Sequence, residues 1–269
     1  MAPVLVGTAV AHAAGHVVLW RSSLALVVSL AIQVGTNYAN DYSDGIRGTD
    51  DERVGPLRLV AGKLATPAEV RTAAVAAFGV AAAAGLALAI ATSLWLLLVG
   101  AACIAAGWLY TGGPRPYGYA GFGEVFVFSF FGLVAVVGTT YVSLGRVTAL
   151  SFVAAVPVGL VATSLLVVNN LRDIETDTVA GKRTLAVKLG DRPTRWLYAS
   201  CVGGALAMVA AVAAWRPVAL VALLGAAAAV RPVRRVLGGD SGRSLVVVLG
   251  MTGLFQLLFA GLLALGVAL

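Results

Sequence analysis

The chain has 269 residues, of which 60% are hydrophobic and only 12% are charged. A soluble domain carries about 25% charged residues, so most helices of this chain would lack a water-facing side in water. The composition therefore excludes a soluble domain and predicts a polytopic membrane protein. The net charge of +7 does not indicate nucleic-acid binding, because the cations lie between apolar runs and form no basic stripe.

The apolar runs predict an all-α fold in a single domain that covers residues 1–269. They are rich in alanine and glycine, which let membrane helices approach closely, and they lack the alternation of β-barrel strands. We expect nine transmembrane helices. The expected spans are Pro3–Leu19, Ser22–Asn40, Thr72–Ala91, Leu94–Tyr110, Gly123–Leu144, Val147–Leu171, Trp196–Trp215, Val218–Val230 and Leu245–Leu269. The uncharged run that holds the third and fourth spans is expected to break near Thr92–Ser93.

Lysine and arginine are distributed unequally between the two sides of this arrangement. Of the 19 Lys and Arg residues, all except Arg21, Arg146 and Arg216 lie on the side of the segments that follow spans two, four, six and eight. The positive-inside rule places that side, and the amino terminus, in the cytoplasm of a bacterial cell whose inner membrane the chain crosses several times. All 12 acidic residues lie on the same side. Acids do not set topology, so their position indicates a function there.

The first acidic cluster follows the second apolar run, in the string NYANDYSDGIRGTDDE of residues 37–52. Asp41 and Asp44 are three positions apart, and Arg47 and Arg53 follow them. The segment between this point and the third span contains several glycines and a proline, which predicts an ordered, turn-rich loop. Together with the segment after the sixth span, this loop is expected to form a cap on the cytoplasmic side.

The second acidic cluster follows the sixth apolar run, in the string NNLRDIETDTVAGKRTLAVKLG of residues 169–190. Asp173 and Asp177 are four positions apart, which puts both carboxylates on one face if the helix continues. Lys182 and Arg183 follow within a few residues. The same order of carboxylates and then cations thus occurs twice, on one side of the membrane, and predicts one shared site.

Carboxylates beside cations suit a metal-bound polyanion. Mg²⁺ takes oxygen ligands, often one or two carboxylates with phosphate oxygens and water. Arginine and lysine would take the remaining phosphate charge. A hydrophobic cavity below such a site fits a substrate with a diphosphate head and a hydrocarbon tail, and a metal-bound diphosphate is a good leaving group. The competing interpretation, solvated charges at helix ends, explains one cluster better than two clusters on the same side.

Asparagines precede both clusters. Asn37 and Asn40 share a helix face with Gln33, and Asn169 and Asn170 precede Asp173. Polar residues inside membrane spans are costly and usually face a cavity, so these asparagines are expected to line the site. For Asn37, hydrogen bonding between helices is an equally good explanation.

Two motifs carry a resemblance to a known family. N40-D41-Y-S-D44 and D173-I-E-T-D177 resemble the two Asp-rich motifs of the intramembrane aromatic prenyltransferases, the UbiA superfamily. The wider strings NYANDYSDGIRGTDDERVGPLR, YTGGPRPYGYAGFGE and VNNLRDIETDTVAGKRTLAVKLG look like the 1,4-dihydroxy-2-naphthoate polyprenyltransferases of menaquinone biosynthesis. The resemblance covers nearly the whole chain. In the broader superfamily an acid often follows the first motif at a position that is Gly48 here.

The resemblance implies that a polyprenyl diphosphate is ionised on Mg²⁺ and alkylates 1,4-dihydroxy-2-naphthoate. CO₂ and diphosphate would be lost, and demethylmenaquinone would form. Carried over by motif position, the residues that hold Mg²⁺ and diphosphate are Asn40, Asp41, Asp44, Asp173 and Asp177. Phosphate oxygens would be bound by Arg47, Arg53, Lys182 and Arg183. Tyr110, in the YTGGP string, would lie near the reacting carbon.

Several assignments stay open at the level of the sequence. Glu124 is expected either to complement a helix dipole or to contact the aromatic acceptor. His12 and His16 are four positions apart without a third ligand nearby, which favours helix packing or a cavity wall over a metal site. The acceptor has alternatives, namely 4-hydroxybenzoate, homogentisate or a tetrapyrrole. A secondary transporter of an anion is the alternative from another class, although the minimal loops on the outer side speak against alternating access.

Overall fold

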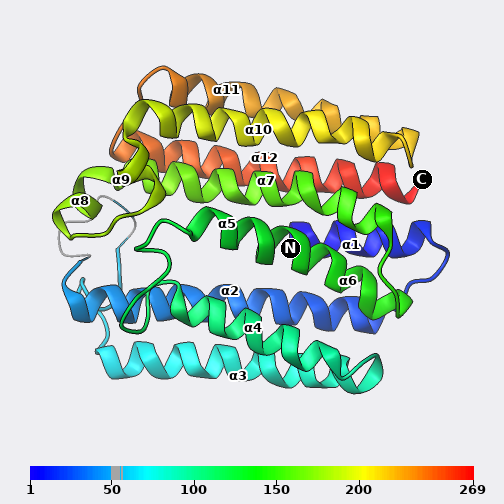
Figure 1. The fold of residues 1–269 in the computed structure, drawn as a ribbon, viewed down its shortest axis with the longest axis horizontal. Coiled ribbons are helices and arrows are strands. Elements are labelled where there is room, and N and C mark those ends of the chain that lie inside the picture. Colours follow the sequence, from blue (N-terminus) through cyan, green and yellow to red (C-terminus); the bar gives the residue numbers. More distant parts are fainter. Residues whose placement is uncertain (50–54, 56) are drawn as a thin grey trace.

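The computed structural model describes residues 1–49, 55 and 57–269, and all the regular elements in these residues are helical (Figure 1). In chain order the elements are α1 (Ala2–Ala13), α2 (Leu19–Arg47), α3 (Pro67–Ala91), α4 (Trp95–Leu109), α5 (Gly123–Val127), the π-helix η1 (Phe128–Val134), α6 (Ala135–Leu144), α7 (Ala149–Arg172), α8 (Ile174–Val179), α9 (Leu185–Leu189), α10 (Asp191–Ala213), the 3₁₀-helix η2 (Pro217–Gly225), α11 (Ala226–Leu237) and α12 (Arg243–Ala268). The expected all-α fold is confirmed.

Seven helical segments of the described chain are long and apolar enough to cross a membrane. They are Leu19–Arg47, Pro67–Ala91, Gly123–Leu144, Ala149–Arg172, Asp191–Ala213, Pro217–Leu237 and Arg243–Ala268. The helices at the expected first and fourth spans are shorter, since α1 has 12 residues and α4 has 15. A helix of the length of α1 extends about 18 Å, less than the hydrocarbon core of a bilayer.

The long helices run roughly parallel to one another along the long axis of the molecule (Figure 1). Helices α2, α3 and α4 form one side of the bundle, and α7, α10, α11 and α12 form the other, with α1, α5 and α6 between them. Helix α2 packs on α3, whereas α7 packs on both α10 and α12. A cavity lies between the two sides.

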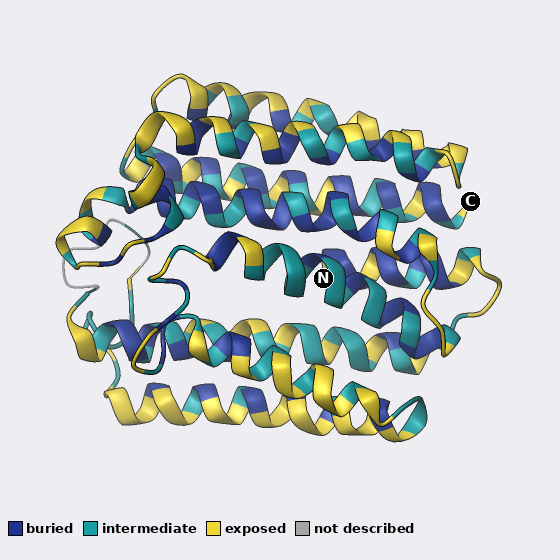
Figure 2. Cartoon of the chain, in the orientation of Figure 1, coloured by how far each residue is buried: buried dark blue, intermediate teal, exposed yellow. Residues whose placement is uncertain are grey.

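Helix α7 lies near the centre of the bundle, and the exposed residues gather on the peripheral helices (Figure 2). The most apolar stretch of α7 is 67% buried, whereas that of α2 is 11% buried. Large apolar side chains stay exposed on the outside, such as Ile90 at 72%, Leu98 at 61% and Leu224 at 70%. In water such a surface would drive aggregation, so this is the surface that faces lipid.

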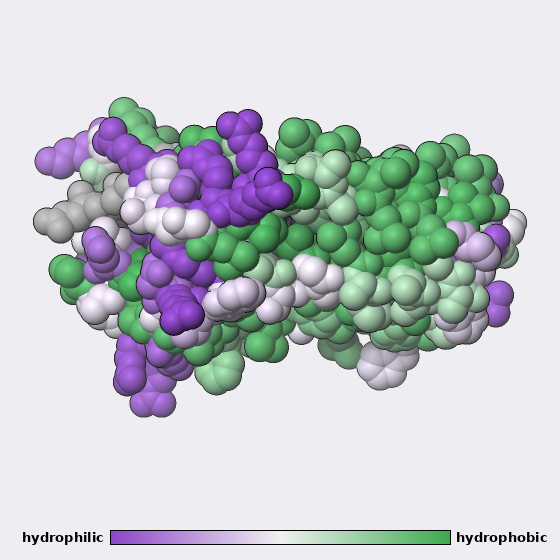
Figure 3. Space-filling model, turned by 90° about the horizontal axis from the view of Figure 1, so that it is seen from above, coloured by the Kyte–Doolittle hydropathy of each residue, from purple (hydrophilic) through white to green (hydrophobic). Residues whose placement is uncertain are grey.

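Hydrophilic residues gather at one end of the molecule (Figure 3). We call this the polar end; it is formed by residues 57–66, 110–122, 173–190 and 238–242, with the last turns of α2. The opposite end, which we call the far end, is formed by the short connections 14–18, 92–94, 145–148 and 214–216. The acidic motifs both lie at the polar end, as the sequence predicted.

Three boundaries bear on the site. The expected second span ends at Asn40, but α2 continues through Arg47 and ends at Gly48, which adopts a left-handed conformation with φ of 67°. Asp41 and Asp44 are therefore helical residues. At the second motif the helix does not continue from Asp173 to Asp177 as one element, because α7 ends at Arg172 and α8 begins at Ile174. The break expected near Thr92–Ser93 is confirmed, since α3 ends at Ala91.

The π-helix η1 brings the fifth span into close contact with α7. A Cβ atom added to Gly132 would lie 2.5 Å from the Cα atom of Gly159, so the two backbones touch. A π-helix widens the turn and shifts which side chains share a face, and such turns occur frequently at functional sites. Here the segment presents Phe130, Phe131 and Val134 to the space between the two sides of the bundle.

Candidate active site

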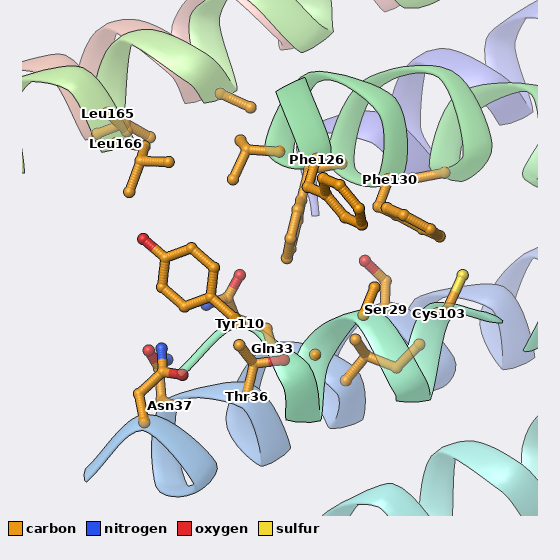
Figure 4. Close-up of a pocket in the computed structure, with 18 of the residues that line it drawn as sticks. Ser29, Gln33, Thr36, Asn37, Cys103, Tyr110, Phe126, Phe130, Leu165 and Leu166 are labelled. Carbon is orange, nitrogen blue, oxygen red and sulfur yellow. The ribbon is translucent and has the colours of Figure 1, made fainter. Parts of the chain in front are cut away.

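A cavity of about 720 Å³ lies between the two sides of the bundle and reaches the polar end. Its walls come from α2 and α4 on one side and from α5, η1, α6 and α7 on the other. Phe126 and Phe130 face Gln33, Thr36 and Cys103 across it (Figure 4). Most of its lining is apolar, and the charged side chains among the described lining residues lie at the polar end.

The first motif gives the cavity one polar wall. Gln33, Asn37, Asn40 and Asp44 line the cavity, as expected for residues at helical spacing on one face of α2. Thr111 donates a hydrogen bond of 2.8 Å from Oγ1 to the Oδ1 atom of Asn40, which fixes the asparagine against the chain after α4.

Asp41 differs from the expectation. Its Oδ2 atom accepts a hydrogen bond of 2.8 Å from the backbone N–H of Leu59, and its Oδ1 atom accepts one of 3.0 Å from that of Val60. The side chain is buried but does not line the cavity. One position along a helix turns a side chain by roughly 100°, so Asp41 faces the loop while Asn40 and Asp44 face the cavity. Asp41 thus anchors the loop between α2 and α3.

Asp44 is the acidic residue of the first motif that faces the second. The Nζ atom of Lys182 donates to its Oδ2 atom at 3.0 Å, and the Tyr119 hydroxyl donates to its Oδ1 atom at 2.5 Å. Burial, together with the nearby Asp44 carboxylate, raises the pKa of Tyr119, so this hydroxyl remains a donor. Lys182 also lies over the Tyr119 ring, 5.0 Å from its centroid.

The second motif supplies the opposite polar wall. Arg172 donates to both carboxylate oxygens of Asp173, at 2.7 and 2.6 Å, and to the Oδ1 atom of Asn169 at 2.9 Å. Asp173 and Asp177 both line the cavity despite the break between α7 and α8, because the Asp177 N–H still donates to the Asp173 carbonyl at 2.7 Å. The Oδ1 atom of Asp177 lies 3.9 Å from the Nζ atom of Lys182.

These carboxylates fit a magnesium ion that is shared with a bound diphosphate. Asp44 and Asp177, from the two motifs, lie on either side of one cation, the Lys182 ammonium. In the described part of the chain, no three His, Cys, Asp or Glu side chains come close enough to hold a metal ion by themselves. Mg²⁺ is commonly bound through one or two carboxylates, with water and substrate phosphates as its other ligands, so the donor set is suitable.

The cations expected to bind phosphate are placed differently from one another. Lys182 is buried at the mouth of the cavity. Arg47 points away from it and donates to the carbonyls of Thr111 and Gly113, and Arg183 is exposed outside the cavity lining. Arg53 lies outside the described residues.

Arg58, which the sequence interpretation did not single out as a ligand, lines the cavity. The same holds for Tyr117 and Tyr119, which come from the segment after α4. Both segments belong to the strings that carry the family resemblance, and this was the only signal that pointed to them. Nothing in their local pattern indicated that they would reach the cavity.

Tyr110 lies where the polar end meets the apolar part of the cavity, and its hydroxyl points into the cavity (Figure 4). Two glycines make room for its ring. A Cβ atom on Gly118 would lie 2.9 Å from the Tyr110 Cε2 atom, and one on Gly123 would lie 3.2 Å from the same atom. The ring also packs edge-on against Tyr117, with centroids 5.5 Å apart. Tyr110 is thus held in one orientation.

Asn170 and Glu124 form a buried pair next to Tyr110. The Nδ2 atom of Asn170 donates to the Oε1 atom of Glu124 at 2.9 Å, and Asn170 lines the cavity. Glu124 is 6% exposed and stands behind Asn170, outside the cavity lining. Among the described residues its Oε2 atom has no hydrogen-bond partner. Glu124 is therefore a buried carboxyl group in the first turn of α5.

The remaining candidates divide between two places. Gln256 of α12 lines the main cavity. His12 lines a separate apolar groove between α1 and α12, and His16 is exposed in the connection after α1. In the described part of the chain, the two histidines belong to no group of three potential metal ligands.

Comparison with known proteins identifies the family and several relatives of this chain. A model of the UbiA prenyltransferase family matches residues 1–245. The chain is 53% identical over 263 residues to the 1,4-dihydroxy-2-naphthoate octaprenyltransferase of Mycobacterium leprae, covering 97% of this chain and 88% of the relative. It is 37% identical over 216 residues to the enzyme of the same name from Escherichia coli, covering 78% of this chain and 70% of the relative.

A solved structure has the same fold. The UbiA homologue from Archaeoglobus fulgidus bound to GPP and Mg²⁺ aligns with a TM-score of 0.58 at 17% identity, covering 99% of this chain and 95% of the homologue. At this identity the likeness concerns the fold alone. Together with the two aspartate motifs at the mouth of one apolar cavity, these matches show that the chain belongs to the UbiA prenyltransferase family.

Proposed function

We propose that this chain transfers a polyprenyl group from a polyprenyl diphosphate to 1,4-dihydroxy-2-naphthoate, with loss of CO₂ and diphosphate, to give demethylmenaquinone. One observation carries the proposal: Asp44 and Asp177, from two distant motifs, lie on either side of Lys182 at the mouth of an apolar cavity. A prenyl diphosphate has the matching shape, with a polyanionic head and an apolar tail. The names of the relatives, matched at 37 to 53% identity, support this donor class and this acceptor.

The head of the donor would lie between the two motifs. Asp44, Asp173 and Asp177 would hold Mg²⁺ together with Asn40, and this ion would neutralise the diphosphate as the C–O bond breaks. Lys182 and Arg58, which reach the cavity, would take phosphate charge directly. In our proposal Arg47 and Arg183 act from outside, by holding the loops that surround the head.

The acceptor would lie between the head and the apolar cavity, beside Tyr110. Tyr110 lines the cavity there, and its aromatic ring would stabilise positive charge on the prenyl carbon through cation–π attraction. Asn37, Asn169 and Asn170 would bind the polar groups of the naphthoate, with Glu124 fixing Asn170 through its 2.9 Å hydrogen bond. The new C–C bond forms on the ring, and the ring carboxylate leaves as CO₂.

We further propose that nine helices cross the membrane, with α1 and α4 completing the seven long segments, and that the polar end faces the cytoplasm. The excess of Lys and Arg at that end supports this orientation. The loops after α2 and α7 would then form a cytoplasmic cap over the diphosphate. A single cysteine placed at the exposed Val179 should react with an impermeant maleimide in inside-out vesicles but not in intact cells. Labelling in intact cells would show that the polar end faces the outside and would overturn the proposed orientation.

The test of the function is a product assay on the purified protein with Mg²⁺, farnesyl diphosphate and 1,4-dihydroxy-2-naphthoate. Diphosphate and CO₂ should appear in equal amounts, and both should stop when Mg²⁺ is chelated. Diphosphate without CO₂ would keep the prenyltransferase but change the acceptor. A folded protein that releases neither product would refute the proposal.

A further inference from the structure

One charged side chain connects three helices at the far end of the molecule. The Arg21 guanidinium donates from Nη1 to the carbonyl of Val142 at 3.0 Å and from Nη2 to the carbonyl of Ala91 at 2.9 Å. These carbonyls lie in the last turns of α6 and α3, where helix carbonyls lack a partner within their own helix. Arg21 itself stands in the first turn of α2. A single guanidinium thus joins three helices.

The apolar cavity reaches this bridge. Ala25 lines the cavity and lies one helical turn from Arg21, on the same face of α2. Val142 lines the cavity while its carbonyl accepts from Arg21, and Leu96, in the first turn of α4, lines it at the same end. Along α2, the distance from Asp44 at the mouth to Ala25 is about 28 Å. Beyond Ala25, the next position on this face of α2 is Arg21.

A hydrocarbon chain cannot easily pass this point. The Nε atom of Arg21 is buried and has no hydrogen-bond partner in the described chain, and the residue as a whole is partly buried. A tail that pushed past the guanidinium would break two charge-assisted hydrogen bonds and leave two helix ends unsatisfied. The surplus of a longer tail therefore has to bend back or leave sideways between helices.

We propose that Arg21 is the floor of the prenyl cavity and a specificity-determining residue, which limits the length of tail that lies straight below the diphosphate. This inference rests on the proposed function, because it needs a prenyl donor in the cavity. It assigns a role in donor choice to a residue more than twenty positions before the first aspartate motif, and it makes no use of the aspartates.

The experiment is an internal competition between farnesyl and octaprenyl diphosphate, at equal concentration, with Mg²⁺ and 1,4-dihydroxy-2-naphthoate. The ratio of the two products gives the ratio of their kcat/KM values, whatever fraction of the enzyme is folded. Arg21→Ala should raise the share of the octaprenyl product by about tenfold, the lower end of what an apolar contact contributes to discrimination. The matched control is Arg216→Ala, because Arg216 also binds a helix carbonyl, that of Ala13, at the far end but away from the cavity. Its ratio should equal that of the wild type.

A second variant tests the same idea from inside the cavity and decides the matter even if Arg21→Ala does not fold. Ala25→Phe raises the floor by one turn, so the octaprenyl share should fall by about tenfold. The inference is overturned if Ala25→Phe leaves the ratio of octaprenyl to farnesyl product unchanged, or if Arg21→Ala lowers both products equally. Arg21 would then serve only to hold the three helices together. A wild type that makes neither product would instead refute the proposed function.

Discussion

The Nζ atom of Lys182 lies 3.0 Å from the Oδ2 atom of Asp44, although the two residues are 138 positions apart in the chain. The side chains are 8% and 6% exposed. The same ammonium lies 3.9 Å from the Oδ1 atom of Asp177, so one cation joins both acidic motifs. At such low exposure water screens the attraction only weakly. The contact therefore fixes how far apart the two walls of the polar end stand.

Replacing Lys182 by methionine keeps the length of the side chain and removes its charge. Asp44 and Asp177 would then repel each other, and breaking a buried ion pair costs on the order of 3–5 kcal/mol. We expect a lower unfolding temperature in detergent. We also expect Mg²⁺ to stabilise Lys182→Met more than the wild type, because a ligand that binds only the native state shifts unfolding by mass action.

The control for this variant is Lys63→Met, at an exposed lysine of the loop between α2 and α3. Its unfolding temperature and its response to Mg²⁺ should match those of the wild type. Equal stabilisation of Lys182→Met and wild type by Mg²⁺ would show that the carboxylates do not share a cation site.

Asp41 and Asp44 should respond differently to the same substitution. Asp44→Asn removes a carboxylate that faces the cavity, so the Mg²⁺ concentration for half-maximal diphosphate release should rise on the order of 10–100-fold. Asp41→Asn can still accept one of its two backbone hydrogen bonds, and losing the other costs about 0.5–1.5 kcal/mol. It should lower stability and leave the Mg²⁺ requirement unchanged. A Mg²⁺ titration in which Asp41→Asn shows the larger shift would make Asp41 the metal ligand.

The helical bundle and the shared polar site were predictable because both depend on local sequence patterns. Apolar runs predicted the all-α bundle and the break after Ala91, and two strings with the same order of acids and cations predicted one shared polar site. Long uninterrupted apolar segments have no other stable form in a membrane. Asp44, Asp173, Asp177 and Lys182, which line the cavity, come from these two strings, whereas Tyr110 was singled out only by the family resemblance.

The direction of individual side chains was not predictable. Asp41 and Asp44 both belong to the motif, but only the folded loop reveals that the backbone of Leu59 and Val60 takes the oxygens of Asp41. Arg47 has enough length to reach either the cavity or the carbonyl of Gly113, and the structure selects the carbonyl. Such choices depend on contacts between residues far apart in sequence, which no periodicity records.

Arg172 holds Asp173 in place and should be needed for catalysis without touching the substrate. Its side chain is 1% exposed and donates to both oxygens of Asp173. Removing such a support typically costs 10–100-fold in metal affinity or activity, so Arg172→Ala should raise the Mg²⁺ requirement by about that factor. Arg172→Lys should recover little, because an ammonium cannot bind both carboxylate oxygens in parallel.

The measurement for this prediction is again a Mg²⁺ titration of diphosphate release, with Arg192→Ala as the control at an exposed arginine of α10. The control should behave as the wild type. If Arg172→Lys restores the wild-type Mg²⁺ requirement, the charge of Arg172 matters and its forked geometry does not.

Gly132 tests whether the contact between η1 and α7 shapes the cavity. A Cβ atom there would lie 2.5 Å from the Cα atom of Gly159. Because this neighbour is a backbone atom, the clash can be relieved only by moving one of the two helices. Gly132→Ala should therefore destabilise the protein by about 1–3 kcal/mol, as overpacking does. Gly138→Ala, six positions later with no atom within 4 Å of its added Cβ, should instead stabilise by up to about 1 kcal/mol, because alanine favours the helix. Thermal unfolding in detergent measures both changes, and a shift of the same sign in the two variants would mean that the close approach of the two backbones does not constrain the fold.

Because Phe130 and Phe131 stand on the same π-helix and line the cavity, Gly132→Ala should also reduce turnover at temperatures where the variant is still folded.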